Sequence, residues 1–157
     1  LLENYIADSS QEEPEVLKEL TRETHLKVLR PRMITGHFQG RVLSMLSKIV
    51  NPVAILEIGT YTGYSAICLA EGLRKEGKLH TIDINEELCD IQQRYFQKSG
   101  YGHNIVQHIG DALKIIPTLD TVFDLVFIDA DKTSYDDYFE CVMKKTRPGS
   151  IILSDNV

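Results

Sequence analysis

Residues 56–66, LEIGTYTGYSA, run from an apolar strand into a turn with two glycines, and the turn opens a helix. A turn of this kind usually holds a nucleotide. The dinucleotide-binding pattern G-x-G-x-x-G has its second glycine at the position of Tyr61, where a side chain removes the room for a pyrophosphate. A Walker loop is excluded because no G-K-[ST] follows. The turn therefore predicts a nucleotide-like ligand that lacks a phosphate to be cradled.

Strands and helices alternate along the chain after residue 51. The near-continuous apolar runs predict strands at 53–59, 78–84, 104–110, 123–130 and 150–155. Helical patterns separate them at 64–77, 85–100 and 133–146, and a short helix or a turn is expected at 112–119. This order predicts an α/β fold, a parallel sheet with helices on both faces. Two earlier helices are expected at 12–29 and 35–50, and the second places a set of apolar residues on one face: Phe38, Val42, Met45, Leu46 and Ile49.

Acidic residues follow every expected strand, and ligands of parallel sheets bind beyond the carboxyl ends of the strands. The preference of Asp and Asn for turns and helix caps explains one or two such acids. It does not explain well why acids follow all five strands at the same position. A carboxylate two residues before Gly59 would repel a pyrophosphate and attract a cation. An acid after the second strand can accept hydrogen bonds from ribose hydroxyls. S-adenosylmethionine fits this pattern, since it has a ribose, an adenine, an ammonium, a sulfonium and no phosphate. The acids, with one amide, are Glu57, Asp83, Asp111, Asp129, Asp131, Asp155 and Asn156.

The motifs LEIGTYTGYSAICLAEGL, LHTIDIN, GDA, FDLVFIDADK and LSDNV, in this order, resemble the cation-dependent class I O-methyltransferases. These are the caffeoyl-CoA and catechol O-methyltransferase-like enzymes, and their bacterial branch is the most similar. The resemblance covers nearly the whole chain, including PRMITGHFQGRVLSML. It implies a Rossmann-like, S-adenosylmethionine-dependent methyltransferase domain over 1–157, with N-terminal helices in 1–51 and the α/β core in 52–157. The family fold continues with two further strands, so the resemblance implies a C-terminally incomplete domain with an exposed apolar edge at SIILS.

The resemblance also implies the residues that contact the cofactor. They fall in the loop before the second helix, in the glycine turn and at the strand ends. The roles of Tyr61 and Tyr64 stay open between ligand contact and simple packing. The implied contacts are Met33 and Thr35 at the methionine part, Glu57, Gly59, Thr60 and Ser65 in the first turn, Asp83 at the ribose, Asp111 and Ala112 at the adenine, and Asp131 at the methionine end.

A divalent cation is implied at Asp129, Asp155 and Asn156, whose hard oxygens suit Mg²⁺, Mn²⁺ or Ca²⁺. Adjacent side chains on a strand point to opposite faces, so Asp155 and Asn156 can both be ligands only where the strand geometry breaks. The resemblance makes Asp129 and Lys132 catalytic, with Lys132 as general base. The alternative for Lys132 is a solvated surface lysine. The implied activity is O-methylation of a hydroxyl on a catechol-like or caffeoyl-type small aromatic.

The amino-acid composition limits which binding partners and which cellular location we expect for the chain. The formal net charge of −6 and the lack of a basic stripe disfavour nucleic acid, including an RNA methyltransferase. No apolar run is long enough to cross a bilayer. The N-terminus is acidic and unlike a signal peptide, and three cysteines without a CxxC motif predict a reduced, cytoplasmic protein, which we expect to be a homodimer. Two alternatives remain: an inactive cofactor- or metal-binding fragment, and an NAD-dependent oxidoreductase, which Tyr61 disfavours.

Overall fold

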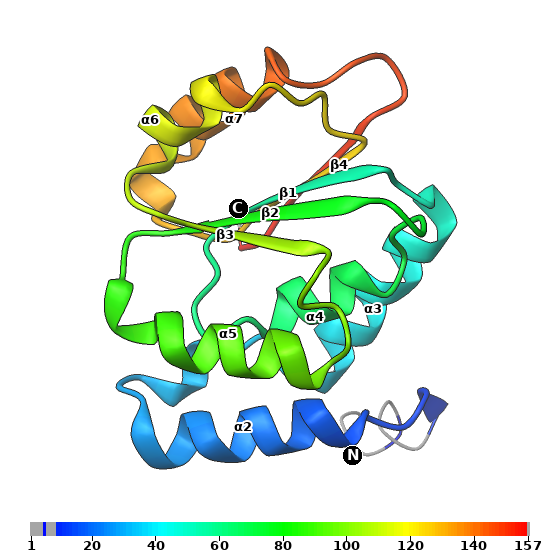
Figure 1. Cartoon of the computed structure of the whole chain (residues 1–157), viewed down its shortest axis with the longest axis vertical. Helices are drawn as coiled ribbons and strands as arrows, with labels where there is room; N and C mark the ends of the chain where they lie inside the picture. The colour runs from blue at the N-terminus through cyan, green and yellow to red at the C-terminus, as the bar shows by residue number, and fades with distance from the viewer. Residues whose placement is uncertain (1–4, 6–8, 157) are drawn as a thin grey trace.

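A parallel sheet forms the centre of the computed structural model, which describes Tyr5 and residues 9–156 (Figure 1). Within these residues the sheet has five strands in the order β3-β2-β1-β4-β5. All four strand pairings are parallel, which confirms the predicted α/β architecture. Both β1 and β4 are buried along their whole length. The strands are β1 (Ala54–Ile58), β2 (Lys78–Asp83), β3 (Ile105–Ile109), β4 (Leu125–Ile128) and β5 (Ile151–Ser154).

Helices cover both faces of the sheet (Figure 1). One face carries α3 (His37–Val50), α4 (Tyr64–Ala70) and α5 (Cys89–Lys98), with α2 (Glu15–Lys27) packed outside them; the other carries α6 (Ala112–Ile115) and α7 (Tyr135–Met143). Short 3₁₀ turns occur at Pro31–Met33, Glu86–Leu88, Ile116–Thr118 and Lys132–Ser134. No helix in the described part of the chain has the length and apolar character needed to span a membrane.

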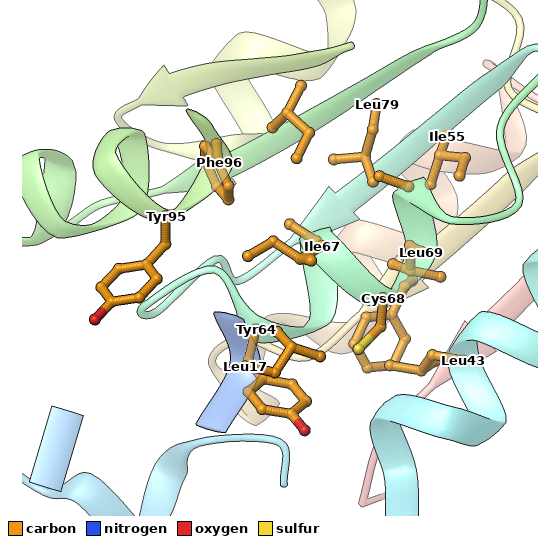
Figure 2. Packing of buried hydrophobic residues seen from close by; sticks show 14 of the residues in the cluster. Leu17, Leu43, Ile55, Tyr64, Ile67, Cys68, Leu69, Leu79, Tyr95 and Phe96 are labelled. Carbon is orange, nitrogen blue, oxygen red and sulfur yellow. The ribbon is translucent and has the colours of Figure 1, made fainter. Parts of the chain in front are cut away.

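Two apolar clusters, one on each face, hold the layers together. Figure 2 shows the larger cluster, in which Ile55 and Leu79 of the sheet lie over Ile67 and Leu69 of α4. All four side chains are at most 2% exposed. Burial of this kind stabilises the fold by about 1.5–3 kcal/mol per large apolar side chain. The clusters therefore fix the strands rigidly, and with them the positions of the residues that follow the strand ends.

The helix α4 is shorter than predicted. The pattern predicted a helix over 64–77, whereas α4 ends at Ala70. A Cβ atom at Gly72 would lie 2.2 Å from the carbonyl carbon of Ser47, so the close packing of the chain against α3 requires glycine there. The N–H of Arg74 then donates to the carbonyl of Pro52 at 3.0 Å, which leads the chain back to the sheet. The predicted C-terminal half of this helix is therefore wrong.

The helix α3 buries a mixed face that consists of Gly40, Arg41, Leu43, Ser44 and Ser47. The predicted apolar residues share one face, but Phe38, Met45 and Ile49 are 55%, 52% and 71% exposed. Arg41 instead packs inward, where its guanidinium donates to Glu71 at 2.7 and 3.2 Å. Ser44 also donates to Glu71, at 2.6 Å. An exposed apolar stripe is thus left on the outer surface of α3.

Candidate active site

A cleft of about 1440 Å³ runs along the carboxyl ends of the strands. The backbone just beyond each strand still bonds to the end of its neighbour, as in Gly59 N–H to Ile82 O at 2.9 Å and Asp155 N–H to Ile128 O at 3.0 Å. These bonds bring the strand ends to one level, as expected for a parallel sheet. The outer wall of the cleft comes from the segment between α2 and α3. Residues from every strand end line the cleft: Gly59, Tyr61, Asp83, Ile84, Gly110, Asp111, Asp129, Asp131, Asp155 and Asn156.

Gly59 lets the first turn pass directly against β4. Its φ is +100°, in the region that favours glycine. A Cβ atom there would lie 2.0 Å from the carbonyl oxygen of Asp129, so no side chain is tolerated at this position. The glycine was predicted as a cofactor contact, and the structure adds that the approach of the two strand ends requires it.

Asp83 is held rigidly at the end of β2. One carboxylate oxygen accepts from the N–H groups of Thr60 and Tyr61 at 3.0 and 2.7 Å, and the other accepts from Asn85 at 2.9 Å. A carboxylate has about four acceptor sites, so capacity remains for a ligand in the cleft. The next residue, Ile84, is 78% exposed in the cleft wall and offers an apolar surface to a flat ring. The sequence analysis did not single out Ile84; its only signal is an apolar residue directly after a strand-ending acid.

Glu57 lies beneath the turn and lines neither the cleft nor the small cavity beside it. Its side chain is fully buried, and its Oε2 accepts from the hydroxyl of Thr81 at 2.5 Å. Its Oε1 has no hydrogen-bond partner among the described residues. Burial raises the pKa of Glu57 to about 8, and the hydroxyls of Ser65 and Thr81 oppose this rise only in part. Glu57, which was predicted as a cofactor contact, thus lies behind the turn and reaches neither cavity.

The other predicted cofactor residues gather around the same cleft. Thr60 and Ser65 line a cavity of about 50 Å³ that shares walls with the cleft. Asp111 begins α6, and its carboxylate accepts from the N–H of Leu113 at 2.9 Å. The carboxylate of Asp131 accepts from two neighbouring hydroxyls, which lower its pKa. The predicted residues that line the cleft itself are Met33, Thr35, Gly59, Asp83, Asp111, Ala112 and Asp131.

The predicted cation ligands converge at the ends of β4 and β5. The strand geometry breaks after Ser154, because Asn156 adopts a left-handed conformation with a φ of +58°. The adjacent side chains of Asp155 and Asn156 then meet, and the Asn156 amide donates to the Asp155 carboxylate. The Nζ of Lys132 donates to the Asn156 carbonyl at 3.2 Å. The geometric condition set by the sequence is therefore met.

The chemistry of this cluster suits a hard divalent cation. Burial, and next the negative charge of Asp155, raise the pKa of Asp129. The described residues contain no group of three or more His, Cys, Asp or Glu side chains that could hold a metal ion. The amide oxygen of Asn156 is a third hard donor, and two carboxylates with an amide are typical of magnesium or calcium sites. The residues present thus fit a bound cation.

Tyr135 supports this cluster and was not identified from the sequence. Its hydroxyl donates to the carbonyl of Asp155 at 2.9 Å and lies 3.4 Å from the carbonyl of Ile128. The tyrosine therefore ties the end of β5 to the end of β4 from the first turn of α7. Its spacing from Asp129 carries no recognisable signal, because the contact depends on where β5 ends.

We expect Glu57→Gln to change the pH dependence of stability. The folded-state pKa of about 8 lies above the ordinary value of 4.5, so raising the pH between these values ionises Glu57 first in the unfolded chain. The parent should lose free energy of unfolding relative to the variant by up to about 1.4 kcal/mol per pH unit. Urea unfolding at pH 5, 6.5 and 8 measures the difference. If the difference in free energy of unfolding between parent and variant stays constant across this pH range, the raised pKa of Glu57 is contradicted.

Known proteins resemble the chain in both sequence and structure. A family model described as O-methyltransferase matches residues 7–157. Caffeoyl-CoA O-methyltransferase 2 of Zea mays is 38% identical over 163 residues, which cover 99% of this chain and 61% of the maize protein. Catechol O-methyltransferase of Niastella koreensis is 32% identical, over 99% of this chain and 72% of that protein. This chain thus spans about three fifths of the maize relative and nearly three quarters of the bacterial one.

The fold is also that of solved O-methyltransferases. The crystal structure of the O-methyltransferase TomG from Streptomyces achromogenes, in complex with SAM, matches with a TM-score of 0.93 and 34% identity. The match covers 99% of this chain and 71% of TomG. The predicted Rossmann-like fold is thereby confirmed. With a family model that matches almost every residue, the chain belongs to the O-methyltransferase family.

Proposed function

We propose that this chain binds S-adenosylmethionine along the strand ends and transfers its methyl group to a hydroxyl of a catechol-like or caffeoyl-type aromatic. The observation that carries the proposal is one cleft that contains both the rigid Asp83 carboxylate and the oxygen cluster of Asp129, Asp155 and Asn156. The names of the relatives support the substrate class. The three cysteines are free, which suits the cytoplasm.

The cofactor would lie with its ribose at Asp83 and its adenine between Ile84 and Asp111. Its sulfonium would supply the methyl group. The positive methionine end would extend past Gly59 toward Asp131, above the buried Glu57. The wall of Met33 and Thr35 would cover this end from outside. The turn suits such a ligand better than NAD, because Tyr61 stands where a pyrophosphate needs a glycine.

The acceptor would bind at the oxygen cluster. A divalent cation held by Asp129, Asp155 and Asn156 would orient an aromatic hydroxyl and lower its pKa. Lys132, whose Nζ lies at this cluster, accepts the proton of that hydroxyl as general base. The cleft walls align the acceptor oxygen with the methyl carbon, and such alignment can supply a large part of the rate enhancement.

The binding of S-adenosylmethionine should depend on Asp83. The Asp83→Ala variant loses a charged hydrogen-bond acceptor worth about 1.5–3 kcal/mol. Calorimetry should therefore show that its affinity for S-adenosylmethionine falls about tenfold or more. Asp155→Ala is the matched control, since it removes a cleft carboxylate away from the ribose position. Its affinity should stay nearly that of the parent. Equal affinities of the parent and both variants would show that Asp83 does not bind the ribose.

Catalysis should require the cation and Lys132. The Lys132→Ala variant should retain binding of S-adenosylmethionine and Mg²⁺ yet transfer methyl groups about 10²–10⁴-fold more slowly, as expected for a lost general base. Lys75→Ala is the control, because this lysine is exposed and does not line the cleft. The measurement is transfer of labelled methyl to ortho-dihydroxy aromatics with saturating Mg²⁺. EDTA should abolish it; a parent rate unaffected by EDTA would refute the cation, and no transfer at all would favour a binding fragment.

We further propose a homodimer formed through the outer face of α3. Burying the exposed side chains of Phe38, Met45 and Ile49 against a second copy would remove apolar surface from water. Met45→Glu should therefore reduce the mass measured by sedimentation equilibrium from two chains to one. Val122→Glu is the control, an apolar residue 55% exposed outside α3. A parent that sediments as one chain would contradict the proposal, as would a dimer that survives Met45→Glu.

A further inference from the structure

Tyr61 joins two walls of the cleft. Its hydroxyl lies 3.1 Å from the carbonyl oxygen of Leu29 and 3.2 Å from that of Arg30, so one O–H donor is shared between two acceptors. The acceptors lie about thirty residues earlier in the chain, in the segment 28–36 between α2 and α3. This segment also carries Met33 and Thr35, which line the outer wall of the cleft. The ring of Tyr61 thus reaches from the glycine turn to the opposite wall.

The backbone of Tyr61 is held by two hydrogen bonds. Tyr61 adopts a left-handed conformation with a φ of +49°, which is uncommon for a bulky residue. Its N–H donates to the Asp83 carboxylate at 2.7 Å, and its carbonyl accepts from the side chain of Gln92 at 2.6 Å. These bonds anchor the residue to the end of β2 and to α5. The hydroxyl therefore extends from a rigid point.

The segment that it reaches has few other restraints. Leu29 and Met33 are 87% and 59% exposed. The backbone bonds within the segment are short-range, from Met33 N–H to Arg30 O and from Ile34 N–H to Pro31 O. Among the side-chain hydrogen bonds of the described residues, only those of the Tyr61 hydroxyl reach residues 28–36. Packing of Val28 and Ile34 against the core supplies the remaining support.

We propose that Tyr61 is a positioning residue whose hydroxyl holds the segment 28–36 over the cofactor site and so slows exchange of the cofactor. The inference rests on the proposed function, because it takes the cleft to be the site of S-adenosylmethionine. The same residue orients Asp83 through its N–H and the outer wall through its hydroxyl. A loss of the hydroxyl should therefore loosen the wall while leaving the ribose contact in place.

The test compares the parent chain with Tyr61→Phe, which keeps the ring and removes the hydroxyl. Hydrogen exchange at the Met33 and Ile34 amides is measured without ligand, and the dissociation rate of S-adenosylmethionine is measured by stopped flow. Both should rise about fivefold, the effect of one net hydrogen bond. Tyr95→Phe is the control, since it removes a tyrosine hydroxyl bonded to Glu23 at 2.8 Å between α5 and α2. It should leave both readouts unchanged.

The outcomes separate the inference from the proposed function. Unchanged exchange and unchanged dissociation in Tyr61→Phe, with a parent that binds the cofactor, overturn the inference and leave the function intact. Faster exchange with unchanged dissociation also overturns it, because the hydroxyl would then be structural only. A parent that does not bind S-adenosylmethionine refutes the proposed function and, with it, the positioning role. Faster exchange and faster dissociation, seen in Tyr61→Phe but not in Tyr95→Phe, support the inference.

Discussion

The contact between Gly59 and the backbone of Asp129 is the constraint on which the cleft depends. The strand order reverses between β1 and β4, so the chain leaves these two strands toward opposite faces and a space opens between the departing turns. Because Gly59 has no side chain, the turn after β1 lies directly against the end of β4. The glycine turn and the Asp129 carboxylate therefore share one wall. A ligand on the turn and a ligand on the oxygen cluster would be neighbours.

Two acidic side chains beside this wall oppose the stability of the chain when they are ionised. Glu57 is fully buried with one unpaired oxygen, and Asp129 faces the like charge of Asp155. Burial raises the pKa of both groups, which is the sign of carboxylates that lack a sufficient counter-charge. A purely structural role would be served better by an amide or by a buried ion pair. Positive charge supplied by ligands would relieve the same repulsion, so this arrangement is typical of a binding site.

The sequence predicted the cleft because the relevant information is local and repeated. Each apolar strand is followed by an acid, and parallel pairing alone brings those acids to one edge. The left-handed conformation of Asn156 and the reach of Tyr61 to Leu29 could not be predicted in this way. The first depends on a single backbone dihedral at the end of a strand. The second depends on the relative placement of segments about thirty residues apart, on which periodicity carries no information.

The orientation of α3 is a second feature that the sequence pattern alone could not predict. Periodicity indicates that a helix has two unlike faces, but the neighbouring element decides which face is buried. Beside α3 stand the Glu71 carboxylate and the Leu69 carbonyl, and they accept from Arg41 and Ser47. Turning the apolar face inward would leave Glu71 poorly paired, which costs several kcal/mol for a buried charge. The ion pair that seats α3 on the core therefore also directs its apolar stripe outward, where a second chain could cover it.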